Sequence, residues 1–64
     1  MLHRALNYVQ NAGGNATVDN FIEDHEPIGS TLFKKLYYER YIFFTSDDFV
    51  HLTKKGCDYL EENK

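Results

Sequence analysis

The side chains best suited to chemistry in this sequence are three histidines and one cysteine. His3, His25, His51 and Cys57 could each ligate a metal ion or exchange a proton, but they lack the paired spacing of zinc ligands. The sequence also shows no Ser/His/Asp set, no paired carboxylates and no glycine-rich phosphate loop. We therefore predict a protein that is not an enzyme, with no metal, no cofactor and no small-molecule ligand.

The basic side chains are the second group with clear chemical potential, because they can bind phosphate. The whole chain has a net charge of −3, which is not typical of a dedicated nucleic-acid binder. The charges are unevenly distributed, however. Residues 15–26 contain four Asp or Glu residues and no Lys or Arg, whereas residues 27–42 contain Lys34, Lys35 and Arg40 against a single glutamate. If a nucleic acid is bound, this segment is the place where the sequence predicts it.

Two helices are predicted ahead of the basic segment. Apolar residues recur at helical spacing over residues 2–12, and the glycine pair 13–14 ends that helix because glycine adopts a left-handed conformation cheaply. A short amphipathic second helix follows. Either Thr17 or Asn15 could cap it, and Thr17 is the favoured residue. Pro27 then ends this helix.

The basic segment itself forms the predicted third helix, capped by Ser30 or Gly29 and running to about Arg40. A helix, a short turn with glycine and another helix make up the helix-turn-helix pattern. The inward face is predicted to be Leu32, Leu36 and Tyr37, with Phe33 or Tyr41 at its edge, and the outward face Thr31, Lys34, Lys35, Tyr38 and Glu39.

Residues 41–53, YIFFTSDDFVHLT, predict a β-hairpin with two aspartates at its tip. Asp47 and Asp48 suit a tight turn, which their side chains could close by hydrogen bonds to the backbone. Strand alternation assigns Ile42, Phe44, Val50 and Leu52 to the inward face, and Phe43, Phe49 and His51 to the outward face, with Phe43 and Phe49 as cross-strand neighbours.

A last helix is predicted from Lys54 to about Glu62, capped by Thr53. Its Gly56, Tyr59 and Leu60 share a face with Leu52 of the hairpin. The elements together predict an α+β fold, mainly α, in one domain that spans residues 1–64. The single cysteine and the absence of a signal-peptide pattern or a long apolar stretch predict a cytoplasmic protein with no membrane association.

This order of elements resembles a minimal winged helix-turn-helix domain. The stretch IGSTLFKKLYYERYI is similar to the recognition helix of prokaryotic regulators of the MarR and PadR type, and VHLTKKGCDYLEE is similar to their Leu-Thr-x-x-Gly ending. The likeness covers about residues 2–62. It implies a three-helix core, a two-stranded wing and a C-terminal helix. Tyr41 departs from the pattern, because a glycine is common before the first wing strand, and so does the acidic wing tip.

The resemblance implies a bacterial or phage transcriptional regulator that inserts its third helix into the major groove of double-stranded DNA. The plainer alternative is that Ser30 only caps the helix and the lysines are solvated. The residues predicted to contact DNA are Ser30, Thr31, Lys34, Lys35, Tyr38, Lys54 and Lys55.

The alternative function is a winged helix used as a protein-interaction module, either an adaptor or a modulator of a host protein. The excess of aromatic residues over what a small core can bury favours a partner or a homodimer. The predicted protein interface consists of Phe43, Phe49 and His51.

Overall fold

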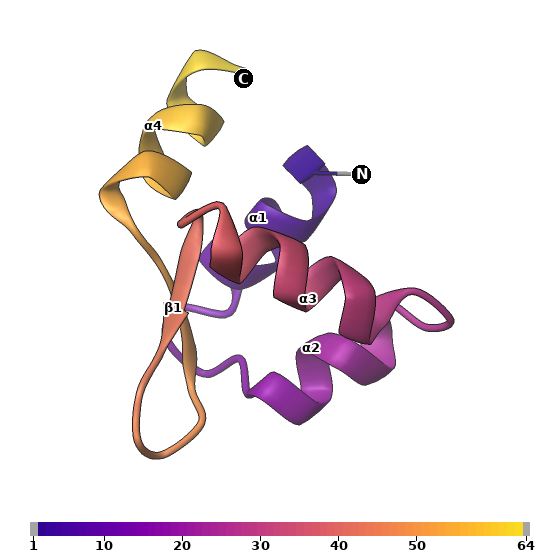
Figure 1. Ribbon diagram of the computed structural model, residues 1–64. Coiled ribbons are helices and arrows are strands. Elements are labelled where there is room, and N and C mark those ends of the chain that lie inside the picture. The colour runs from indigo at the N-terminus through magenta and orange to yellow at the C-terminus, as the bar shows by residue number, and fades with distance from the viewer. Residues whose placement is uncertain (1, 64) are drawn as a thin grey trace.

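The computed structural model describes residues 2–63, which form four helices and one antiparallel hairpin. The elements follow in the predicted order: α1 (Leu2–Asn11), α2 (Val18–Asp24), α3 (Gly29–Tyr38), β1 (Ile42–Phe44), β2 (Val50–Leu52) and α4 (Lys54–Glu62). Figure 1 shows α3 lying across α2, with the turn of the hairpin extending away from the helices. The fold is α+β and mainly helical, as predicted.

The first helix buries one apolar stripe and ends close to the predicted place. Ala5, Leu6 and Val9 are buried in the core. The chain leaves the helix through Gly13 and Gly14, which have φ angles of 59° and 91°. This region of backbone conformation favours glycine, so the glycine pair sets the end of α1.

The second helix has the predicted cap. The Thr17 side-chain oxygen accepts a hydrogen bond of 3.1 Å from the Asn20 backbone N–H. Thr17 also belongs to a segment that joins the hairpin, because the Val50 N–H donates to the Ala16 carbonyl at 2.7 Å and the Val18 N–H donates to the Asp48 carbonyl at 2.9 Å. The start of α2 is therefore held against β2.

The start of the third helix differs from the prediction. Ile28, rather than Ser30 or Gly29, occupies the N-cap position, and it makes no side-chain capping hydrogen bond. Gly29 is already inside the helix and lies against α2, where an added Cβ would stand 2.0 Å from the Ile22 carbonyl oxygen. The close crossing of the two helices thus requires glycine here, and it leaves Ser30 in the first turn with an exposed side chain.

The inward face of α3 also needs a correction. Leu32, Leu36 and Phe33 are buried, whereas Tyr37 is 41% exposed. The prediction had placed Tyr37 inside and Phe33 at the edge. Phe33 turns inward because its ring packs edge-on against buried Phe21, with a centroid distance of 5.8 Å. Tyr37 then stacks on the outer side of Phe33.

The backbone conformation of Arg40, two residues after the end of α3, explains why the chain needs no glycine immediately before the hairpin. Arg40, rather than Tyr41, has the left-handed conformation, with a φ of 66°. The Tyr41 N–H reaches back to the Leu36 carbonyl at 2.9 Å, which closes the helix end. An arginine therefore occupies a position that glycine would adopt with less strain.

The hairpin pairs Ile42 with Leu52, Phe43 with His51 and Phe44 with Val50. Ile42 and Val50 are buried, as predicted. Phe44, predicted to face inward, is 42% exposed, although its ring centroid lies 5.8 Å from that of buried Phe33.

The predicted pairing of Phe43 with Phe49 is wrong. The Thr45 N–H donates to the Phe49 carbonyl at 3.0 Å, so the turn occupies residues 45–48. This register places His51 opposite Phe43, and Phe49 bridges to Thr17 on the other side of β2.

The last helix is fixed by Thr53 and Gly56. The Thr53 side-chain oxygen accepts from the Gly56 N–H at 3.2 Å and donates to the Arg40 carbonyl at 2.5 Å. A Cβ added at Gly56 would lie 2.3 Å from the Tyr41 carbonyl oxygen, so only glycine allows α4 to approach this closely. Leu60 is buried, and α4 packs against α1 and β2. Thr53 therefore caps α4, as predicted.

Candidate nucleic-acid interface

The exposed side of α3 carries the polar side chains predicted to contact DNA. Its buried positions, 29, 32, 33 and 36, recur at one helical spacing, and the exposed positions 31, 34, 35 and 38 repeat that spacing on the opposite side. Thr31, Lys34, Lys35 and Tyr38 therefore form one continuous strip, with Ser30 at its N-terminal flank. We call these five residues the α3 strip.

The lysine side chains of the α3 strip make no polar contact with the other described residues. The ion pair seen between two described residues joins Lys54 and Asp58, and no hydrogen bond joins the Lys34 or Lys35 ammonium to residues 2–63. Tyr38 is 75% exposed. The first turn of α3 contains no acidic residue. Glu39, which is also exposed, follows at the C-terminal end of this side. The strip is thus best suited to an anionic ligand over its N-terminal part, from Ser30 to Lys35.

The neighbouring helix has the opposite charge. Asp19, Glu23 and Asp24 of α2 and Glu26 of the following turn are all exposed. Asp24 accepts a 2.5 Å hydrogen bond from the Tyr8 hydroxyl, and this bond raises the pKa of Tyr8 to about 12, with burial of the phenol as a second cause. A polyanion approaching the molecule is therefore favoured at α3 and disfavoured at α2.

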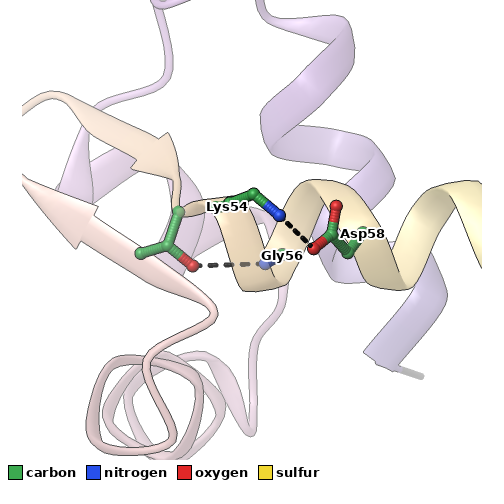
Figure 2. A network of polar contacts seen from close by, with 4 residues as sticks. Lys54, Gly56 and Asp58 are labelled. Carbon is green, nitrogen blue, oxygen red and sulfur yellow. Dashed lines mark hydrogen bonds and ion pairs between the residues drawn. The ribbon is translucent and has the colours of Figure 1, made fainter.

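Lys54 and Lys55 begin α4 and have partners within the molecule. Lys54 forms an ion pair with Asp58 at 3.1 Å, one helical turn further along (Figure 2). Lys55 donates to the Glu39 carbonyl at 2.8 Å, and its ammonium lies 4.3 Å from the centre of the Tyr41 ring. Lys55 thereby satisfies the C-terminal end of α3. The ion pair of Lys54 is exposed and weak enough to be exchanged for a phosphate.

The tip of the hairpin is acidic and is held by Thr45. The Asp48 N–H donates to the Thr45 carbonyl at 2.9 Å, and the Phe49 N–H donates to the Thr45 hydroxyl at 3.3 Å. Asp48 has a φ of 65°, a conformation that aspartate tolerates better than most residues. Within residues 2–63, neither aspartate side chain closes this turn, contrary to the prediction. Thr45 does so instead, and Asp47 and Asp48 are exposed.

Aromatic side chains gather beside the α3 strip, at the C-terminal half of α3 and on β1. Tyr37 contacts both Tyr38 and Phe44, with centroid distances of 5.6 and 5.2 Å. Phe43 is 44% exposed and stacks on His51 at 5.3 Å. We call Tyr37, Tyr38, Phe43 and Phe44 the aromatic surface.

A hollow of about 410 Å³ opens at this surface, lined by Tyr37, Tyr38, Arg40, Ile42, Phe43 and Thr53. Of the residues predicted to form a protein interface, Phe43 and His51 lie together, and Phe49 is half-buried on the opposite edge. Sequence reasoning did not assign Tyr37 and Phe44 to this surface, because helical and strand periodicity alone place both residues inside.

The histidines and the cysteine are dispersed. No group of three metal-ligating side chains occurs among the described residues. His25 stacks on Phe21 at 4.3 Å and donates from Nδ1 to the Phe21 carbonyl at 2.7 Å, so it closes the end of α2. Cys57 is a free, exposed thiol.

Comparisons of the chain with protein-family models, with curated proteins and with solved structures gave no match. None of the helices in residues 2–63 is both long and apolar enough to cross a bilayer.

Proposed function

We propose that this protein is a winged helix-turn-helix DNA-binding protein, in which α3 is the recognition helix and the hairpin is the wing. The observation that carries the proposal is the α3 strip. It presents two cations, two hydroxyl-bearing residues and a tyrosine on the side of α3 opposite the core. A helix with its side chains is about 10–12 Å across, so α3 can enter the major groove, which is roughly 12 Å wide.

The α3 strip contains side chains for both kinds of DNA contact. Ser30 and Thr31 stand at the N-terminal end of α3, where backbone N–H groups and the helix dipole favour a phosphate. Lys34 and Lys35 can reach either a phosphate or the edge of a guanine. The wing tip, with two exposed aspartates, is unsuited to phosphate. In this proposal the wing therefore packs beside the duplex without gripping it.

Binding under this proposal is weakly electrostatic. Four cations are available near α3 and the start of α4: Lys34, Lys35, Arg40 and Lys54. Neutralising three or four phosphates gives a slope of roughly −3 to −4 in log K against log salt. A regulator of this kind acts in the cytoplasm of a bacterium, or of a bacterium infected by a phage.

The test is a gel-shift titration with random duplex DNA at low salt. Wild type is expected to bind, and Lys34→Ala with Lys35→Ala is expected to lower the affinity by at least roughly tenfold. Arg4→Ala, which removes an exposed cation from α1, is the control for a general change in charge. If wild type does not shift duplex DNA, or if the double variant binds like wild type, DNA is not the ligand.

A second function is favoured by the aromatic surface. Tyr37, Tyr38, Phe43 and Phe44 are each at least 41% exposed, and contiguous apolar surface of this kind marks protein interaction sites. Under this reading the protein is an interaction module, and Tyr38→Ala abolishes capture of its partner without loss of helical circular dichroism. Retained capture by Tyr38→Ala would argue against this second function.

A further inference from the structure

The hollow at the C-terminal end of α3 is lined by three aromatic side chains whose rings pack against other rings. Tyr37 lies parallel to buried Phe33, with ring centroids 6.4 Å apart, and Tyr38 contacts Tyr37 at 5.6 Å. Phe43 stacks on His51 at 5.3 Å. Tyr37, Tyr38 and Phe43 are nevertheless 41%, 75% and 44% exposed. At about 410 Å³, the hollow is as large as pockets that bind small organic groups, which are roughly 300–1,000 Å³, so it has room for a flat ligand.

Cations accompany these aromatic rings. Arg40 lines the hollow, and no ion pair or hydrogen bond joins its guanidinium to another described residue. Lys34 and Lys35 stand one helical turn before Tyr38, on the same side of α3. Glu39 is the one acidic residue in this stretch against the three cations. The hollow is therefore suited to a ligand that combines flat, apolar groups with negative charge.

The backbone conformation of Arg40 indicates that its side chain has a use beyond the fold. Its φ of 66° lies in the left-handed region, where glycine meets less strain. The Arg40 side chain does not close the end of α3, because the Tyr41 N–H and the Lys55 ammonium do so. Strained backbone conformations of this kind cluster at ligand sites. An arginine at a position that favours glycine, with no polar contact to its guanidinium among the described residues, is explained by a ligand.

We propose that this hollow binds unpaired bases of single-stranded DNA. Two neighbouring bases stack on Tyr38 and Phe43, and Arg40 binds the phosphate between them. Aromatic rings stack on any base, since every base has a π-face, and a guanidinium can bind a phosphate through two parallel hydrogen bonds. The choice of DNA rests on the proposed function. Tyr38 belongs to both the α3 strip and the hollow, so a strand that leaves a duplex held at α3 continues into the hollow.

A DNA strand suits this surface better than a protein does. A protein that covered the three rings would also cover Arg40, and a buried charge without a partner is costly. A second copy of this chain would bring the same cations toward the first, and like charges repel across an interface. A single strand carries one phosphate with each base, so it meets the rings and the cations together.

The first test compares three fluorescently labelled DNA probes by anisotropy at low salt. They are a single strand of about ten thymidines, a blunt random duplex, and the same duplex carrying that strand as an overhang. Wild type is expected to bind the single strand. It should also bind the overhang duplex at least roughly fivefold more tightly than the blunt duplex, because the overhang supplies bases to the hollow.

The three probes separate this proposal from the proposed function. If the blunt duplex is bound and the overhang adds nothing, the hollow is not a base site and duplex binding stands. If the single strand is bound and the blunt duplex is not, the hollow is a base site and duplex recognition by α3 is wrong. Failure of all three probes overturns both, and self-association of the protein in sedimentation would then make the hollow a protein interface. A strand of uridine ribonucleotides that binds as tightly as the thymidine strand would overturn the assignment to DNA.

The second test examines stacking. Phe43→Leu keeps an apolar side chain but removes the π-face, and should lower affinity for the single strand at least roughly fivefold. Phe43→Tyr, which keeps the ring, should bind like wild type. Phe44→Leu is the matched control, because Phe44 is 42% exposed on the same strand and does not line the hollow. Equal affinities of the two leucine variants would contradict stacking at Phe43, and circular dichroism shows whether each variant is folded.

The third test separates the phosphate contact from the stacking contact. Arg40→Gly removes the cation at a position that glycine adopts readily, so thermal stability should not fall. The magnitude of the salt slope for the single strand should fall by about 0.7, which is the loss of one phosphate contact. Tyr38→Ala should weaken binding with the slope unchanged, and Arg4→Ala, on α1, should change neither quantity. If Arg40→Gly keeps the wild-type affinity and slope, Arg40 does not bind the phosphate and the proposal is wrong.

Discussion

The sequence contains two adjacent lysine pairs, and the structure treats them differently. The side chains of Lys34 and Lys35, in the middle of α3, form no ion pair or hydrogen bond with another described residue. Lys54 and Lys55 begin α4 and are engaged by Asp58, the Glu39 carbonyl and the Tyr41 ring. The two pairs are chemically identical. Their difference comes from what stands beside each helix.

The position of α4 accounts for the engagement of the second pair. Gly56 lets the first turn of α4 lie against the Tyr41 carbonyl, so Lys55 reaches the unpaired carbonyl at the end of α3. No element covers the outer side of α3, which is formed by residues 31, 34, 35 and 38. A pair of lysines is therefore a ligand site or a structural contact according to its surroundings, and the first pair is the better candidate for phosphate.

The largest effect is expected from removing the close approach that positions the second pair. Gly56→Ala forces a Cβ toward the Tyr41 carbonyl and should lower the free energy of unfolding by about 2–3 kcal/mol, despite the better helix propensity of alanine. Urea denaturation measures this change. Cys57→Ala, at an exposed position of the same helix, should change stability by less than about 0.5 kcal/mol. Equal stability of the two variants would show that Gly56 does not set the helix position.

The two pairs should differ next in their effect on DNA affinity. Lys34→Ala with Lys35→Ala should lower duplex affinity at least roughly tenfold and reduce the magnitude of the salt slope by about 2, because two phosphate contacts are lost. Lys54→Ala with Lys55→Ala should lower affinity less than about threefold. Fluorescence anisotropy over a range of salt concentrations gives both quantities. A larger loss for the second double variant would reverse the assignment.

Stability should show the opposite ranking. Lys55→Met removes a hydrogen bond to the end of α3 and a cation–π contact, and should lower the free energy of unfolding by about 1 kcal/mol. Lys34→Met, on the uncovered side of α3, should stay within about 0.5 kcal/mol of wild type. Thermal denaturation of the two variants tests this ranking, which fails if Lys34→Met is the less stable protein.

A smaller, pH-dependent effect should come from the hydrogen bond that ties α1 to α2, the helix that supports α3. The pKa of Tyr8 is raised from about 10 to about 12 by its bond to Asp24, so the protonated phenol is stabilised by folding. This contribution is fully present below about pH 10 and is lost as the pH rises through about 12. Tyr8→Phe should lower stability by about 0.5–1 kcal/mol at pH 7. The difference from wild type should shrink above pH 10. A difference that stays constant to pH 12 would contradict this account.

Local patterns predicted most of the secondary structure. Helical spacing located the four helices, the glycine pair 13–14 located the end of α1, and Thr17 and Thr53 were correctly identified as caps. These features depend on residues close together in the chain. Strand alternation also placed Ile42 and Val50 in the core.

The errors occurred where a distant segment decides the outcome. Phe33 is buried instead of Tyr37 because Phe21 of α2 offers it an edge-on contact. Phe43 faces His51 instead of Phe49 because Thr45 closes the turn and fixes the register. Ser30 does not cap α3 because Gly29 must lie inside the helix to pass α2. In each case the local sequence is compatible with two arrangements, and a contact with another part of the fold decides which one forms.

By itself, the sequence determined the order of the elements, most of the core and the strip of polar residues on α3, because these follow from periodicity and capping. The tertiary structure alone decided that Lys55 closes the end of α3 and that Tyr37 and Phe44 join Tyr38 and Phe43 on one surface. The physical reason is that these properties depend on contacts between residues far apart in the sequence. The pattern of polar and apolar residues along the chain does not specify those contacts.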